Sequence, residues 1–372
     1  MTIALHNVAN IGTLKEPIVS NQILFQPFQY KSLTLRNRFV MAPMTRVQSP
    51  GGLPTQAVVD YYARRARAEV GLILSEGTVI ERPGSANHPD IPHFYGDALP
   101  VWQNVIHAVH REHGQMGPQI WHVGNVPPQD PSRPPTQPPE GPGTMTTQEV
   151  ERAIVAFGEA AGNARKLGFD CVELHGAHGY LIDQFFWDRT NQRSDAFGGK
   201  TLVDRSHFAL EVIKAVRAAL GPDIALILRL SQWKPQDYQV KLAADPQALE
   251  QWLLPLVNAG VDILHCSQRR FWEPEFAGSD LNFAGWAKKI TGHPTITVGS
   301  VGLQGDVGGA FRGESSPTQN LDELTRRFER GDFDLVAVGR ALLQDPLWVQ
   351  KIKMDRTAEI APFTPASFAT YF

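Results

Sequence analysis

The most constraining feature of this 372-residue sequence is a regular alternation of short apolar segments with amphipathic helical segments, repeated eight times. Near-continuous apolar runs are typical of parallel strands that are buried on both faces. Eight consecutive strand–helix units predict a single-domain α/β fold, the (β/α)8 TIM barrel, with an open doubly wound sheet as the alternative. The expected strands are 38–44, 71–77, 117–124, 169–175, 224–230, 261–266, 294–299 and 334–339.

The helical segments end at recognisable stop residues and begin at recognisable caps. Thr146 and Glu149 fit a capping box at the start of the third helix, and Gly221 and Gly260 follow two helix ends. No strand is followed by the glycine patterns of dinucleotide-binding or P-loop sites. The expected helices are 55–69, 99–113, 147–167, 202–220, 246–259, 282–290, 321–330 and 340–349.

Two segments fall outside this alternation. Residues 1–24 are expected to be irregular and to pack across one end of the domain. Residues 126–143 are crowded with proline and glycine. Because strand–helix alternation resumes directly afterwards, we expect an active-site loop there and not a domain linker. The whole chain, 1–372, is therefore predicted to be one domain.

Charge and cysteine content exclude several classes of function. A formal net charge of -3 gives no electrostatic footprint for nucleic acid or an anionic membrane. No run of about 18 apolar residues suits a membrane span, and the N-terminus does not resemble a signal peptide. Cys171 and Cys266 lie in strand-like runs, so buried free thiols and a cytoplasmic location are expected.

One stretch concentrates hydrogen-bonding side chains within six residues. His175 ends the fourth strand, and His178 and Tyr180 lie on the glycine-bounded turn that follows it. Two other interpretations stay open from this stretch alone: half of a His-x-x-His metal site, or ordinary turn residues.

The other strand ends help to choose among these interpretations, because a barrel collects its working residues at the C-terminal ends of its strands. They supply few carboxylates, so we expect no metal site. The last two strands end in Gly299-Ser300 and Gly339-Arg340, where backbone N–H groups and a guanidinium can meet a phosphate. The strand ends therefore predict a phosphorylated ligand.

From about residue 25 to 349 the chain resembles the old yellow enzyme family of FMN-dependent ene-reductases. Five motifs in the family's order carry this resemblance: 37–46 (NRFVMAPMTR), 119–124 (QIWHVG), 173–184 (ELHGAHGYLIDQ), 229–231 (RLS) and 338–340 (VGR). The resemblance implies noncovalent FMN with NADPH or NADH as reductant. It assigns the flavin ring to Pro43, Met44, Thr45, Gly77, Gln119 and Arg229, and the phosphate to Gly299, Ser300, Gly339 and Arg340.

The resemblance also implies the substrate side of the site. His175 and His178 match the pair that binds the carbonyl oxygen of an α,β-unsaturated substrate, and Tyr180 matches the proton donor. Trp121 would border the substrate pocket, or it belongs to the core. The implied function is ping-pong reduction of small activated alkenes by NAD(P)H. A flavin dehydrogenase, a metal-dependent barrel enzyme and a flavin-binding protein without turnover are the alternatives.

Several positions depart from the family pattern. Asn125 stands where arginine is common, Asp204 where asparagine is usual, and Gln232 where proline follows the RLS motif. The loops 126–143 and 268–280 are distinctive. These departures leave open the substrate range and the subgroup within the family. The sequence as a whole also leaves open the choice between NADH and NADPH, and whether the protein is a monomer or a homo-oligomer.

Overall fold

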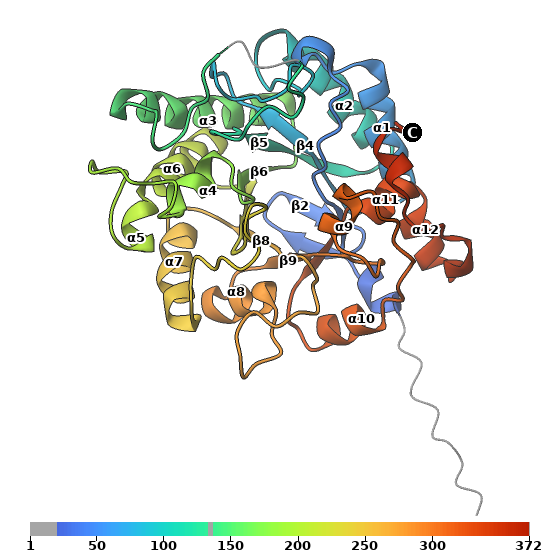
Figure 1. Cartoon of the computed structure of the whole chain (residues 1–372). Helices are drawn as coiled ribbons and strands as arrows, with labels where there is room; N and C mark the ends of the chain where they lie inside the picture. Colours follow the sequence, from blue (N-terminus) through green and yellow to red (C-terminus); the bar gives the residue numbers. More distant parts are fainter. Residues whose placement is uncertain (1–20, 133–136, 372) are drawn as a thin grey trace, which may run out of the picture.

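Eight parallel strands close into a barrel in the computed structural model, which describes residues 21–132 and 137–371 (Figure 1). Each strand pairs with the next along the chain, and the last strand, β10, pairs with the first, β3. This closure confirms the predicted TIM barrel and rules out an open sheet. The strands are β3 (Phe39–Met41), β4 (Leu72–Val79), β5 (Gln115–Trp121), β6 (Cys171–Gly176), β7 (Ala225–Ser231), β8 (Ile263–Ser267), β9 (Thr295–Val298) and β10 (Leu335–Val338).

The helices surround the barrel (Figure 1). Because β10 pairs with β3, the first and last strand–helix units lie side by side. The capping box is present: the Thr146 hydroxyl accepts from the Glu149 N–H, and the Glu149 carboxylate accepts from the Thr146 N–H. The helices are α1 (Gln56–Arg67), α2 (Leu99–Arg111), α3 (Thr147–Leu167), α4 (Leu181–Phe186), α5 (Leu202–Arg205), α6 (His207–Leu220), α7 (Pro246–Asn258), α8 (Phe283–Thr291), α9 (Val307–Phe311), α10 (Asp322–Glu329), α11 (Arg340–Gln344) and α12 (Trp348–Lys353).

Two expected helices are each divided in two, for different reasons. The helix expected over 202–220 breaks at Ser206, next to Arg205, which donates to the carbonyls of Phe186 and Lys200. The helix expected over 340–349 breaks at Asp345, which is extended (φ -135°, ψ 101°). Pro346 causes this second break, because the residue before a proline is driven out of the helical region.

A short antiparallel hairpin, which the sequence analysis did not predict, packs into one apolar cluster with the barrel interior. It is formed by β1 (Phe28–Tyr30) and β2 (Leu33–Leu35). Phe28, Leu33 and Leu35 pack with inward residues such as Cys171 and Ile227. This apolar cluster fills the barrel interior beneath the working face, so that a ligand entering the barrel must lie above it.

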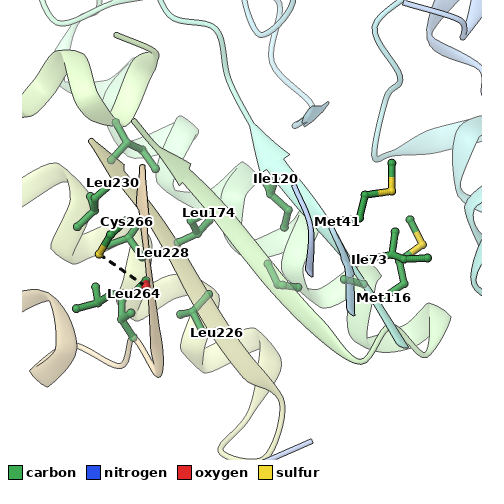
Figure 2. Packing of buried hydrophobic residues seen from close by; sticks show 14 of the residues in the cluster. Met41, Ile73, Met116, Ile120, Leu174, Leu226, Leu228, Leu230, Leu264 and Cys266 are labelled. Carbon is green, nitrogen blue, oxygen red and sulfur yellow. Dashed lines mark hydrogen bonds between the residues drawn. The ribbon is translucent and has the colours of Figure 1, made fainter. Parts of the chain in front are cut away.

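A second apolar layer fills the space between the strands and the helices. Every second residue of a strand points outward into this layer, as Figure 2 shows for Ile120, Leu174, Leu228 and Leu264. In β6 the period of two therefore sends Val172 and Leu174 outward to the helices. The intervening residues 171, 173 and 175 are left for the barrel interior.

The segments outside the alternation are only partly described. Residues 1–20 and 133–136 lie outside the described ranges, and Asn21–Phe25 forms the 3-10 helix η1. Shorter 3-10 turns lie at Pro50–Gly52 (η2), Gly96–Ala98 (η3), Thr357–Glu359 (η4) and Pro365–Phe368 (η5). In the described part of the chain, every helix is too short or too polar to cross a membrane.

Candidate functional site

A cavity of about 660 Å³ opens at the C-terminal ends of the strands. Its walls combine residues from six strands and the loops that follow them, as the barrel geometry requires. The cavity brings together thirteen of the predicted site residues: Pro43, Met44, Thr45, Gln119, Trp121, His175, His178, Tyr180, Arg229, Gly299, Ser300, Gly339 and Arg340.

Gly77 is the one predicted site residue that is not part of this lining. It lies inside β4, and a Cβ atom at this position would stand 2.3 Å from Cε3 of Trp121. Glycine is therefore needed here for the close approach of the Trp121 ring, which itself lines the cavity. Whether Gly77 also contacts a flavin stays a prediction.

Successive inward residues of β6 pass from apolar core to polar site. Cys171 packs in the apolar interior, and one step higher the Glu173 carboxylate accepts from Gln119 (2.7 Å). His265 lies 2.6 Å from the same carboxylate through Nδ1. His175 stands above them and lines the cavity. Glu173 thus fixes two neighbouring side chains directly beneath the ligand space.

The two predicted histidines lie edge to face, with ring centroids 5.2 Å apart. His175 Nδ1 accepts the Ala177 N–H (3.3 Å), which leaves the proton of a neutral ring on Nε2. His178 has a left-handed backbone (φ 62°) and contacts Ser267 Oγ through Nε2 at 2.8 Å. Burial, reinforced by the nearby Arg229 cation, holds the pKa of both rings well below the ordinary range, so both are neutral.

Tyr180 completes this cluster. Its ring lies edge-on to His175 (centroids 4.9 Å) and to Trp121 (4.6 Å). Burial raises the pKa of Tyr180 to about 12, and Arg229 opposes only part of this effect. The phenol therefore keeps its proton throughout the physiological range. A protonated phenol and two neutral imidazole rings share one wall of the cavity.

Arg229, the arginine of the RLS motif, has the properties expected of a cofactor contact. Its guanidinium is buried, its Nε has no hydrogen-bond partner in the described chain, and burial lowers its pKa. A buried guanidinium with an unpaired N–H group is costly, so the site suits a ligand that carries or develops negative charge. The ring of a reduced flavin meets that requirement, and the residues present fit FMN.

The opposite end of the cavity is built from backbone turns. Gly299 (φ 146°) and Ser300 (φ 54°) both have positive φ, and a Cβ at Gly299 would lie 2.5 Å from the Gln268 carbonyl. Arg340 donates to the carbonyls of Gly305 and Asp306. Burial lowers its pKa to about 10, so it stays charged. These features fit the phosphate of FMN.

Several cavity residues were missed by the sequence analysis. Trp233 packs on His178 (centroids 4.9 Å) and on Tyr238 (5.0 Å), and it follows the RLS motif after an unusual Gln232. The departure from the motif was the only available hint of this aromatic wall. Serine hydroxyls gave no hint at all, because serine is common after strands. The missed lining residues include Trp233, Tyr238, Ser267, Phe311 and Phe368.

The proline-rich loop contributes less to the cavity than expected. Gln129 is its one described residue in the lining. At the other end of the loop, Glu140 pairs with Arg82 and lies 2.8 Å from His122 Nε2. These contacts anchor the loop to the ends of β4 and β5.

Within residues 21–132 and 137–371, no group of three His, Cys, Asp or Glu side chains is arranged to hold a metal ion.

Comparisons with known proteins agree with this geometry. The model of the NADH:flavin oxidoreductase / NADH oxidase family matches residues 23–359. The chain is 32% identical over 362 residues to 12-oxophytodienoate reductase 7 of Oryza sativa subsp. japonica, covering 89% of this chain and 88% of that protein. NADH oxidase of Thermoanaerobacter brockii is 32% identical over 361 residues, covering 91% of this chain and 52% of that protein. A structure of morphinone reductase with tetrahydroNAD superposes with a TM-score of 0.75 at 25% identity, covering 93% of each chain.

Proposed function

The chain belongs to the old yellow enzyme family of NADH:flavin oxidoreductases, and from that premise we propose that it reduces the C=C bond of α,β-unsaturated carbonyl compounds. Family membership makes it an FMN- and NAD(P)H-dependent oxidoreductase acting on C=C bonds. Relatives named for 12-oxophytodienoate and morphinone support small-molecule alkenes as its substrates. A cytoplasmic location is part of the proposal and is supported by the free thiols of Cys171 and Cys266.

Bound FMN supplies hydride transfer from NAD(P)H to the β-carbon of the alkene, in two successive half-reactions. The chain's part is to stabilise the negative charge that grows on the carbonyl oxygen. His175 and His178 are neutral imidazoles on one wall of the cavity, and in this proposal each donates to this oxygen and stabilises it by roughly 3 kcal/mol. Arg229 adds a buried positive charge beside them.

Tyr180 supplies the proton to the α-carbon in this proposal. Its ring touches those of His175 and Trp121, so the hydroxyl belongs to the same wall as the carbonyl donors. With a pKa of about 12, the phenol is fully protonated at neutral pH and can act as a general acid. Trp121 forms the apolar border that keeps the alkene next to this acid.

The observation that carries the proposal is the convergence of His175, His178 and Tyr180 on one cavity. The test is an anaerobic redox cycle. Purified protein should be yellow, should bleach with NADPH or NADH, and should regain its colour when cyclohexenone is added. Protein that cannot be reconstituted with FMN, or reduced protein that no enone of a panel reoxidises, would contradict the proposal.

A further inference from the structure

His178 is held at three points by residues outside its own turn. Its backbone N–H donates to Ser231 Oγ (3.0 Å), which supports the left-handed conformation. Its ring packs on Trp233, whose Nε1–H donates to the Ser267 carbonyl (3.1 Å). Its Nε2 lies 2.8 Å from Ser267 Oγ at the end of β8. The ring therefore has one orientation, with Nε2 directed at a hydroxyl group.

The remaining question is which ring nitrogen of His178 carries the proton. A neutral imidazole has one N–H group, and a serine hydroxyl can either donate or accept. If Ser267 accepts from Nε2, then Nδ1 is a bare acceptor. If Ser267 donates to Nε2, then Nδ1 carries the proton and is a donor. Only the second arrangement gives the cavity two histidine donors, since His175 already presents Nε2–H.

The proposed carbonyl ligand favours donation by Ser267. In the described chain the Ser267 hydroxyl has no contact other than His178 Nε2, and His178 Nδ1 has no protein partner. Donation to Nε2 gives the hydroxyl proton an acceptor and leaves Nδ1–H for a ligand. The reverse arrangement would leave a lone pair at Nδ1 for a carbonyl oxygen, and two acceptors cannot form a hydrogen bond with each other.

We propose that Ser267 is a positioning residue that places the His178 proton on Nδ1 by donating its hydroxyl hydrogen to Nε2. His178 Nδ1–H and His175 Nε2–H then form a two-donor clamp for a single carbonyl oxygen. The clamp selects ligands whose oxygen accepts two hydrogen bonds, as a carbonyl oxygen or its enolate does. This inference rests on the proposed function, because it assigns both histidines to one ligand oxygen.

The first test is the protonation state of His178 in the FMN-loaded protein. Long-range ¹H–¹⁵N spectra of histidine-labelled protein distinguish the two ring nitrogens, and loss of signals in His178→Gln assigns them. We expect a protonated Nδ1 in the wild type and a shift toward Nε2–H in Ser267→Ala. Ser267→Thr keeps a hydroxyl group and should keep the wild-type spectrum. Ser206→Ala, which removes a hydroxyl bonded to Leu202 O (2.8 Å) far from the cavity, is the matched control.

The second test links the spectrum to binding. In Ser267→Ala the KM for cyclohexenone should rise by about tenfold, while Ser206→Ala should keep the wild-type KM. A wild-type spectrum with protonated Nε2 would overturn the inference, as would a Ser267→Ala variant that keeps Nδ1–H or the wild-type KM. The expected spectra in a protein that does not reduce enones would instead refute the proposed function alone.

Discussion

The two ends of the cavity recognise their ligands in different ways. The end between β9 and β10 relies on backbone, with Gly299 in a conformation that a side chain would block and Arg340 held by main-chain carbonyls. The end formed by β6, β7 and β8 relies on side chains, and one of them, His178, is held by serine side chains of two other strands, Ser231 and Ser267. Backbone recognition of a phosphate needs few residues, whereas a side-chain clamp needs a second set of residues to fix its geometry.

The largest expected effect concerns the side-chain end. Tyr180→Phe removes the proposed acid but keeps the ring that packs against Trp121 and His175. Reoxidation of the reduced enzyme by cyclohexenone should slow by roughly 10²–10⁴-fold. Flavin reduction by NADPH should be preserved, because no proton is delivered to a carbon in that step. Stopped-flow absorbance of the flavin measures both rates, and equal losses in the two would show that Tyr180 only maintains the site.

A buried ion pair beneath the same end provides the next test. Lys234 and Asp183 are fully buried and paired, and Asp183 also accepts the N–H of Gly179 (2.6 Å), between His178 and Tyr180. Lys234→Met leaves the carboxylate buried without its cation, which should lower the free energy of unfolding by about 3–5 kcal/mol. Denaturant unfolding of the FMN-loaded protein measures this loss.

The double variant Lys234→Met with Asp183→Asn is the control for that experiment. An asparagine at 183 keeps an oxygen that accepts the Gly179 N–H but carries no charge. The double variant should therefore recover most of the stability lost in Lys234→Met, together with the rate of enone reduction. If the double variant is no more stable than Lys234→Met, the loss comes from packing and not from the unpaired charge.

The difference between the two ends also explains what the sequence could and could not predict. Gly299 and Arg340 were found because turns with positive φ and helix starts leave visible residues in the chain. His175, His178 and Tyr180 were found because they occupy one short motif. Their supports were missed, since Ser231 and Ser267 come from other strands and Lys234 from the loop after β7, and only the closed barrel brings them near.

The fold, like the site, was predictable only where the information is local in the sequence. The eight strand–helix units were predictable, because the period of hydrophobic residues is local information. The β1–β2 hairpin was missed because each of its strands has only three residues, too few for a periodic pattern. The break at Asp345 was predictable in principle from Pro346. The break at Ser206 was not, because it accompanies a contact of Arg205 with the carbonyl of Phe186, 19 residues away.

At the backbone end, the effect of a single side chain should be smaller and of another kind. Arg340→Met removes one charge-assisted contact with the proposed phosphate, so the dissociation constant of FMN should rise by about 10–100-fold. The rate of enone reduction for each bound FMN should stay near the wild-type value. Fluorescence titration of the apoprotein with FMN measures the affinity. A variant with full FMN occupancy but slow enone reduction would break the assignment of the two ends.

The smallest expected effect is a lack of pH dependence, which distinguishes neutral histidines from charged ones. Burial holds the pKa of His175 and His178 well below the ordinary value of about 6.5, so both rings stay neutral as the pH falls from 8 to 6. Tyr180, with a pKa of about 12, also keeps its proton in this range. The KM for cyclohexenone in the reoxidation step should therefore change by less than about twofold between pH 6 and 8. If the proposed clamp used imidazolium donors instead, binding would strengthen as the pH fell through the ordinary histidine pKa. Such a rise in affinity for cyclohexenone would mean that His175 or His178 binds as a charged imidazolium, and not as a neutral ring with a fixed tautomer.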